Sequence, residues 1–405
     1  MQTYTEDPAA LRKCLLPSTT ANHVSRTSRL PEFYDELEND NSSSCTARLI
    51  LNQLRWLDYI AQPEALTEKL IEPIVVYLKE LMNENSELTV PILDALSNLT
   101  LHSESLDDVK ETVLDRLESA ELDDIAVILK FMLQTVTPNT VDMVILGIRQ
   151  KLDFRALGKI QQDNSQRRTK QSLSQRSNVK DTPEALILES IKLGLQFHKF
   201  VCEAWFRTIM ALETARAHKI IDVLILFILY SMPSMKKKAE SAIKKKIIQG
   251  LITAPLLEET IMCHASGLAS YWNVILSLSE GLLRSCQQNG TISPCASTLY
   301  ISSFKVCDSY YRQEIIGSLV THIGSGVEAE MSIALNVLLH LAKSDVSSVT
   351  VYSVFIKGIL DYLDNLSLYQ IRILFDIFSL IALTVSCMMM IITSVIIVIL
   401  EQQYC

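Results

Sequence analysis

The densest group of chemically active side chains lies in the sequence MKKKAESAIKKKII. It holds six lysines within eleven residues: Lys236, Lys237, Lys238, Lys244, Lys245 and Lys246. Corresponding lysines of the two triplets are eight positions apart, so on an α-helix they lie about 80° apart and share a broad face. Such a face can contact the phosphates of a nucleic acid without reading its bases, because no aromatic side chain is interleaved. The alternative is an ordinary solvated helix face.

A second basic group lies in the polar segment GKIQQDNSQRRTKQSLSQRSNVKD, residues 158–181. The segment has few apolar residues and no aromatic ones, so it cannot bury enough surface to offset the cost of ordering and is predicted to be a mobile loop. Its DNA-backbone candidates are Arg167, Arg168 and Lys170. Two Ser-Gln dipeptides, at Ser165 and Ser174, are candidate phosphorylation sites, where a phosphate would cancel part of the positive charge. A plain linker is the alternative.

Motifs for catalysis or cofactor binding are absent from the sequence. It contains no G-x-x-x-x-G-K-S/T, G-x-G-x-x-G, H-E-x-x-H or G-x-S-x-G pattern, so phosphate-cradle and hydrolase chemistry are not expected. The neighbouring Cys263 and His264 cannot complete a tetrahedral metal site without distant ligands. Nine scattered cysteines without a C-x-x-C pair indicate a reducing compartment. We expect a protein that is not an enzyme and holds neither metal nor cofactor.

The elements that must position these side chains are predicted to be helices. Glycine and proline number only 11 each in 405 residues, and 48% of the residues are hydrophobic, which favours a large helical core. The formal charge of −9 argues against a protein that binds polyanions over its whole surface, although local basic patches remain able to act.

The spacing of apolar residues predicts a series of amphipathic helices. In residues 104–118, apolar residues recur every three or four positions, with acidic residues mainly on the other side. Further helical segments are predicted at about 121–136, 139–153, 184–213, 217–231, 239–252, 256–264, 268–288, 296–309, 312–323, 328–342, 349–364 and from 368 onward. Ser367 and Gln370 form a capping-box pattern, and Leu366 with Ile371 can form a hydrophobic staple. The tryptophans Trp56, Trp205 and Trp272 lie in apolar stripes and are expected in the core.

Together these segments predict an all-α fold, an α-solenoid of irregular antiparallel helix pairs of the HEAT/ARM type. Its expected parts are a poorly ordered N-terminal segment, two parts of the solenoid separated by the basic loop, and an apolar tail. Their predicted bounds are 1–45, 46–157, 158–182, 183–376 and 377–405, with the loop at 158–182.

The apolar tail has no charged residue between Ile377 and Leu400, which meets the roughly 20 residues that a membrane-spanning helix requires. The tail is interpreted either as a membrane anchor or as an aberrant chain end. A tail-anchored helical-repeat adaptor at a membrane is therefore one functional hypothesis.

Four longer strings resemble the N-terminal solenoid of the Fanconi anaemia group D2 family. They are RLILNQLRWLD (48–58), ELTVPILDALSNL (87–99), IIGSLVTHIGSGVEAEMSIALNVLLHL (315–341) and VFIKGILDYLDNLS (354–367). The resemblance runs in order from about residue 48 to about 378 and implies an α-solenoid, in agreement with the helical periodicity.

The resemblance also implies a function, that of a nuclear scaffold without enzymatic activity in the repair of DNA interstrand crosslinks. Members of the family pair with the Fanconi anaemia group I paralogue, are mono-ubiquitinated by the Fanconi core ubiquitin-ligase complex and close as a clamp around double-stranded DNA. They carry a checkpoint-kinase Ser-Gln site after a string that LDF (152–154) matches here, so Ser165 is the corresponding position and Ser174 the second candidate.

This chain departs from the family pattern in its final part. The ubiquitin acceptor of the family lies downstream of the string DYLDN, and no lysine follows Lys357 here. We therefore expect no ubiquitin acceptor in this chain, which is interpreted as a partial or truncated form, with shortened regions around 17–31 and 71–85.

Overall fold

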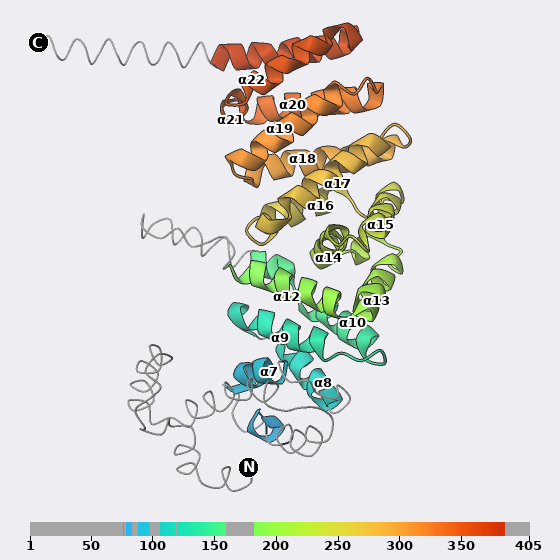
Figure 1. The fold of residues 1–405 in the computed structure, drawn as a ribbon, viewed down its shortest axis with the longest axis vertical. Helices are drawn as coiled ribbons and strands as arrows, with labels where there is room; N and C mark the ends of the chain where they lie inside the picture. The colour runs from blue at the N-terminus through green and yellow to red at the C-terminus, as the bar shows by residue number, and fades with distance from the viewer. Residues whose placement is uncertain are drawn as a thin grey trace, which may run out of the picture. The chain divides into compact units, whose positions relative to one another are not determined.

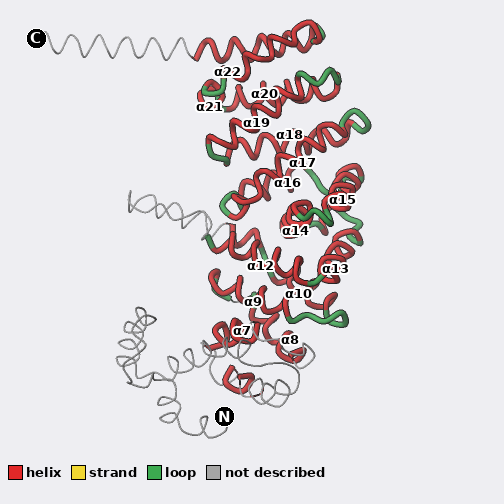
Figure 2. Tube along the Cα trace, viewed as in Figure 1, coloured by secondary structure: helices red, strands yellow, loops and turns green. Residues whose placement is uncertain are grey.

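The computed structural model describes residues 76, 78–82, 88–97, 106–118, 120–158 and 182–384. Within these ranges the chain forms helices and connecting loops and contains no strand, which confirms the all-α prediction (Figure 2). The chain divides into two compact units, Met1–Thr100 and Leu101–Cys405. The described part of the first unit includes α7 (Thr89–Ser97), which buries Ile92, Leu93 and Leu96. The predicted N-terminal segment 1–45 and the residues around Trp56 lie outside the described residues.

The second unit carries the candidate site, and its helices follow one another along the chain (Figure 1). They are α8 (Asp107–Arg116), α9 (Leu122–Gln134), α10 (Val141–Lys151), α12 (Pro183–Phe197), α13 (Lys199–Met210), η4 (Ala215–Ala217), α14 (Ile220–Ser231), α15 (Lys236–Ile248), α16 (Ala254–Cys263), η5 (Gly267–Tyr271), α17 (Trp272–Ser285), η6 (Gly290–Ile292), α18 (Ser293–Val306), α19 (Ser309–Ile323), α20 (Glu328–Ser344), α21 (Val346–Thr350), α22 (Ser353–Lys357) and η7 (Gly358–Asn365). A further helix occupies residues 368–384.

Each helix of the second unit packs mainly on helices a few places away in the chain. The closest pairs are α9 with α12, α10 with α13, α14 with α15, α16 with α18, α17 with α18 and α19 with α20. Contacts that pass from one helix pair to the next are the pattern of an α-solenoid, and they confirm the predicted fold class. Because such a core is built by stacking one helix pair on the next, each surface helix is stabilised by contacts with its immediate neighbours.

Several helix starts are set by residues that the sequence makes visible. The Ser367 hydroxyl accepts from the Gln370 backbone N–H at 3.4 Å, and the Gln370 side chain accepts from the Ser367 N–H at 2.8 Å. This reciprocal pair confirms the predicted capping box. Thr182 caps α12 by accepting from the Ala185 N–H, with Pro183 in the first helical position.

Two predicted helices are interrupted. The segment 184–213 divides into α12 and α13 at His198, whose backbone is extended (φ −122°, ψ 113°) and whose ring contacts the Gln134 carbonyl at 3.0 Å. Neither glycine nor proline marks this break, so local sequence gave no signal of it. The segment 349–364 divides into α21, α22 and η7, which makes the unbroken helix predicted there wrong.

The last described helix, residues 368–384, overlaps the beginning of the predicted apolar tail. Ile377 and Ile381 are buried in the same core cluster as Ile373 and Leu374, on the helix 368–384. The beginning of the predicted tail is thus a continuation of a core helix. No helix in the described ranges has the length and apolar character needed to cross a membrane, and residues 385–405 lie outside them. Trp205 and Trp272 are both buried, as predicted.

Candidate nucleic-acid interface

Helix α15 presents the predicted lysine face. Its inner stripe of Ala239, Ala242, Ile243 and Ile247 is buried, and the helix packs on α14. It ends at Gly250, whose positive φ of 69° places the chain in the left-handed region. The N–H groups of Gly250 and Leu251 bond back to the carbonyls of Ile247 and Lys246, at 2.9 and 2.8 Å. This is a Schellman motif, and it fixes where the helix and its lysine face end.

Four of the six lysines are exposed on this helix, namely Lys236, Lys237, Lys238 and Lys245. The ammonium of Lys236 lies 5.0 Å from the centre of the Tyr230 ring and 3.4 Å from the Ser277 hydroxyl, so it is drawn toward the neighbouring helices. Lys237, Lys238 and Lys245 point their charges to solvent from positions that recur every seven or eight residues. These three form what we call the α15 lysine face.

Lys244 and Lys246 are engaged within the protein. Lys244 is partly buried and forms an ion pair with Glu240 at 2.7 Å. Lys246 is only 2% exposed, and its ammonium donates to the carbonyls of Met210, at 3.1 Å, and Leu212. Burial lowers the pKa of Lys246, and the neighbouring charge of Lys245 lowers it further. The prediction that all six lysines share a phosphate-facing surface is wrong for Lys246, because its charge satisfies carbonyls at the end of α13.

The lysines of the first turn are unfavourable for the helix itself. Lys236, Lys237 and Lys238 occupy the N-terminal end of α15, which has no acidic residue in its first turn. The helix dipole is positive at that end, so cations there cost typically 0.3–1 kcal/mol each at exposed positions. Three lysines at this end of α15 lower the stability of the helix. Their presence favours a role for the charge in binding rather than in folding.

The remaining candidates lie in residues 159–181, outside the described residues. They are Ser165, Arg167, Arg168, Lys170 and Ser174. No position, contact or burial is assigned to them, so the predictions made for these five residues stay predictions.

The described residues at the two ends of that segment meet the same side chain. His264 at the end of α16 bonds through Nδ1 to Glu184 Oε1 at 3.0 Å, and Ser266 donates to the other carboxylate oxygen at 2.9 Å. Gly158 lies against the same histidine, since a Cβ there would come within 3.3 Å of His264 Cε1. Gly158 and Glu184, on either side of residues 159–181, therefore both lie beside His264.

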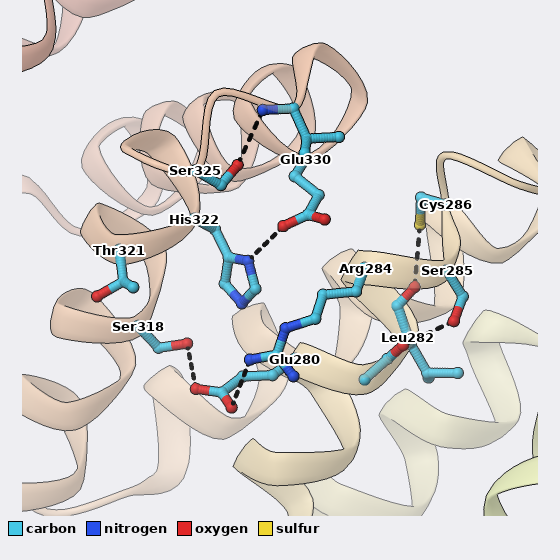
Figure 3. Close-up of polar contacts among 12 residues, drawn as sticks. Glu280, Leu282, Arg284, Ser285, Cys286, Ser318, Thr321, His322, Ser325 and Glu330 are labelled. Atoms are coloured by element: carbon cyan, nitrogen blue, oxygen red, sulfur yellow. Dashed lines mark hydrogen bonds and ion pairs between the residues drawn. The ribbon is translucent and has the colours of Figure 1, made fainter.

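Sequence reasoning missed the buried polar pairs that hold the helices in place. The guanidinium of Arg149 donates to both carboxylate oxygens of Asp222, at 2.7 and 2.9 Å, and also to the Ala217 carbonyl. In Figure 3, Ser318 donates to Glu280 at 2.9 Å and His322 bonds to Glu330 at 2.9 Å. Polar residues on otherwise apolar helix faces were the available signal for these positions.

The five described cysteines are free thiols: Cys202, Cys263, Cys286, Cys295 and Cys307. Burial raises the pKa of Cys286 and that of Cys295 to about 11, so both remain protonated near neutral pH and are poor nucleophiles. In the part of the chain that the structure describes, no group of three or more His, Cys, Asp or Glu side chains is arranged to hold a metal ion.

Comparison with known proteins identifies relatives over most of the chain. Residues 74–403 match the family model described as "Fanconi anaemia protein FancD2 nuclease". The Fanconi anemia group D2 protein homolog of Mus musculus is 33% identical over an alignment 444 positions long, which covers 94% of this chain and 30% of the mouse protein. The rat homolog matches equally well, and the Gallus gallus group D2 protein is 29% identical over 94% of the chain and 31% of its own length. The chain thus spans about a third of the length of these curated relatives.

Proposed function

Because the chain belongs to the FancD2 family of Fanconi anaemia proteins, we propose that it is a helical scaffold of the Fanconi anaemia DNA-repair pathway that contacts double-stranded DNA through phosphates. The observation that carries the DNA contact is the α15 lysine face. Its three ammonium groups are exposed and lie on a helix whose first-turn charge opposes its own dipole.

The proposal extends to the partners of the family. We propose that the solenoid pairs with the group I paralogue in the nucleus, and that a checkpoint kinase phosphorylates Ser165 first and Ser174 second. The proposal does not extend to ubiquitination by the core ligase complex, because no lysine follows Lys357 in this sequence. The word nuclease in the name of the family model enters no step of the proposal, which rests on binding alone.

A DNA-binding measurement tests the proposal. The variant K237Q/K238Q/K245Q removes the α15 lysine face without touching the buried stripe, so the fold should be kept. Fluorescence anisotropy with a labelled duplex is expected to show an affinity loss of at least tenfold in 0.15 M salt, similar for unrelated sequences. The salt dependence should flatten by about 3 in the slope of log K against log salt, since each phosphate contact contributes about 0.9.

The matched control changes three exposed lysines elsewhere, Lys199, Lys305 and Lys343, to glutamine. It alters the net charge by the same amount, so a general charge effect would weaken both variants equally. An equal loss in the two variants, or unchanged binding in the first, would remove the α15 lysine face from the proposal. Pairing is measured separately, by size-exclusion chromatography with light scattering after mixing with the group I paralogue, and absence of a complex would contradict that part.

A further inference from the structure

A cleft of about 700 Å³ opens on the second unit, and no residue of α15 lines it. Its walls come from residues 150–155 at the end of α10 and beyond, from the stretch 215–221 that includes η4 and the start of α14, and from the start of α16. The volume falls within the range of roughly 300–1,000 Å³ that small-ligand sites occupy. Both α14 and α16 begin at this cleft, so the positive ends of two helix dipoles face it.

Three cations line the cleft, one from the stretch 150–155 and two from the stretch 215–221. Arg155, Arg216 and Lys219 are all exposed. Arg216 forms no ion pair with any residue that the structure describes. Lys219 donates one ammonium proton to the Arg149 carbonyl at 3.1 Å, which leaves two others to bind a ligand. This arrangement suits an anionic group that accepts several hydrogen bonds.

A buried histidine, His218, also lines the cleft. His218 is 5% exposed, and its Nδ1 donates to the Thr214 carbonyl at 3.0 Å. Burial lowers the pKa of His218, and the charges of Lys246 and Arg149 act in the same direction, so the ring is neutral near pH 7. Because Nδ1 carries the proton, Nε2 holds a free lone pair, and no described residue bonds to it. Nε2 is itself enclosed by the protein, so the ring contributes a neutral part of the wall and no contact with a ligand.

The cleft is also lined by two carboxylates, Asp153 and Glu259. Arg155 forms an ion pair with Glu259 at 2.7 Å, while Asp153 bonds only to its local backbone N–H at Arg155. A uniformly charged polyanion such as duplex DNA would be repelled by these groups. A ligand that places a cation next to its anion would satisfy both signs of charge.

From the cleft, its cations and the carboxylate of Asp153 we infer that this site binds a phosphorylated peptide segment that carries arginine beside the phosphorylated residue. The phosphate contacts Arg216 and Lys219, whose geometry and charge suit phosphate oxygens. The peptide arginine lies against Asp153. This inference is independent of the proposed DNA contact, because none of its residues belongs to the α15 lysine face.

A suitable probe has the sequence of residues 160–171, IQQDNSQRRTKQ, in which two arginines follow the serine closely. A labelled peptide with phosphoserine at position 165 and its unphosphorylated form are titrated with the full chain by fluorescence anisotropy. We expect the phosphopeptide to bind at least tenfold more tightly. The variant R216Q/K219Q should lose at least tenfold of that affinity, while K237Q/K238Q, which removes two equally exposed lysines of α15, should bind within twofold of the unchanged chain.

Several outcomes would overturn the inference. Equal binding of the two peptides would show that the phosphate is not recognised, and unchanged binding by R216Q/K219Q would place the peptide elsewhere. Displacement of the phosphopeptide by equimolar 5′-phosphorylated duplex, with the same sensitivity to R216Q/K219Q, would assign the cleft to nucleic acid instead. If R216Q/K219Q loses phosphopeptide binding but keeps duplex binding, the cleft and the α15 lysine face are separate sites. Thermal melting of each variant shows that the fold is intact.

Discussion

The outer face of α15 and the buried junction beneath it both carry several charges, and they use them in opposite ways. On the outer face, Lys237, Lys238 and Lys245 extend into solvent. In the junction, Lys246 and Arg149 donate to carbonyls of one connection, residues 211–219 between α13 and α14. A charge therefore becomes part of the fold only where backbone or carboxylate oxygens replace its water, and charge elsewhere is free to serve binding.

The largest expected effect comes from breaking the junction. Asp222→Ala leaves the Arg149 guanidinium buried without its carboxylate and also removes the acceptor for the Lys219 N–H at the start of α14. Loss of one partner of a buried ion pair costs about 3–5 kcal/mol, so we expect the free energy of unfolding in urea to fall by that amount.

The control for this variant is Asp142→Ala, which removes the partner of Arg207 from an ion pair at 2.8 Å whose two side chains are both more than half exposed. Surface pairs of this kind contribute about 0–1 kcal/mol. Similar destabilisation by the two substitutions would contradict the distinction between buried and exposed charge.

The adjacent residues Lys245 and Lys246 differ in the same way, one exposed and one buried. Lys246→Met removes the donor to the Met210 and Leu212 carbonyls and is expected to cost about 1–3 kcal/mol, the penalty for unsatisfied buried polar groups. Lys245→Met, one residue earlier on the exposed side, should change stability by less than about 0.5 kcal/mol. Urea denaturation of both variants tests this, and duplex binding should show the reverse order, with Lys245→Met the weaker binder. Equal stabilities would mean that the Lys246 contacts contribute nothing.

The smallest expected effect is a gain in stability. Lys237→Glu places an anion in the first turn of α15, where the helix dipole favours negative charge, and should raise the free energy of unfolding by about 0.3–1 kcal/mol. The same change should weaken duplex binding, because it reverses one charge of the α15 lysine face. Lys245→Glu, in the last turn, is the matched control and should lower stability by a similar amount. A loss of stability in Lys237→Glu would refute the dipole argument.

The fold was largely predictable because helical periodicity and caps are local properties. The α15 segment was expected at 239–252 and is found at Lys236–Ile248, and the capping box at Ser367 is present as predicted. The break at His198 was not predictable, since its contact with the Gln134 carbonyl joins residues 64 positions apart. Local patterns cannot report such tertiary contacts.

The candidate site was predictable in part for the same reason. Lys246 follows Ala239, Ala242 and Ile243 at helical spacing, so its place on the buried stripe was visible in the sequence. Its carbonyl partners on another helix were not. The Arg149–Asp222 pair and the cleft lined by Arg216 likewise depend on segments that meet only in the folded chain.

Because Lys246 is buried and Lys245 is exposed, covalent labelling of their amines can measure local opening at α15. Reagents and enzymes that acylate lysine need the ε-amine exposed and uncharged at the moment of reaction. Lys245 meets the first condition in the folded chain, whereas Lys246 meets it only when α15 separates from the connection 211–219. The ratio of acylation at these adjacent residues therefore measures how often that part of the solenoid opens, with Lys245 as the internal standard.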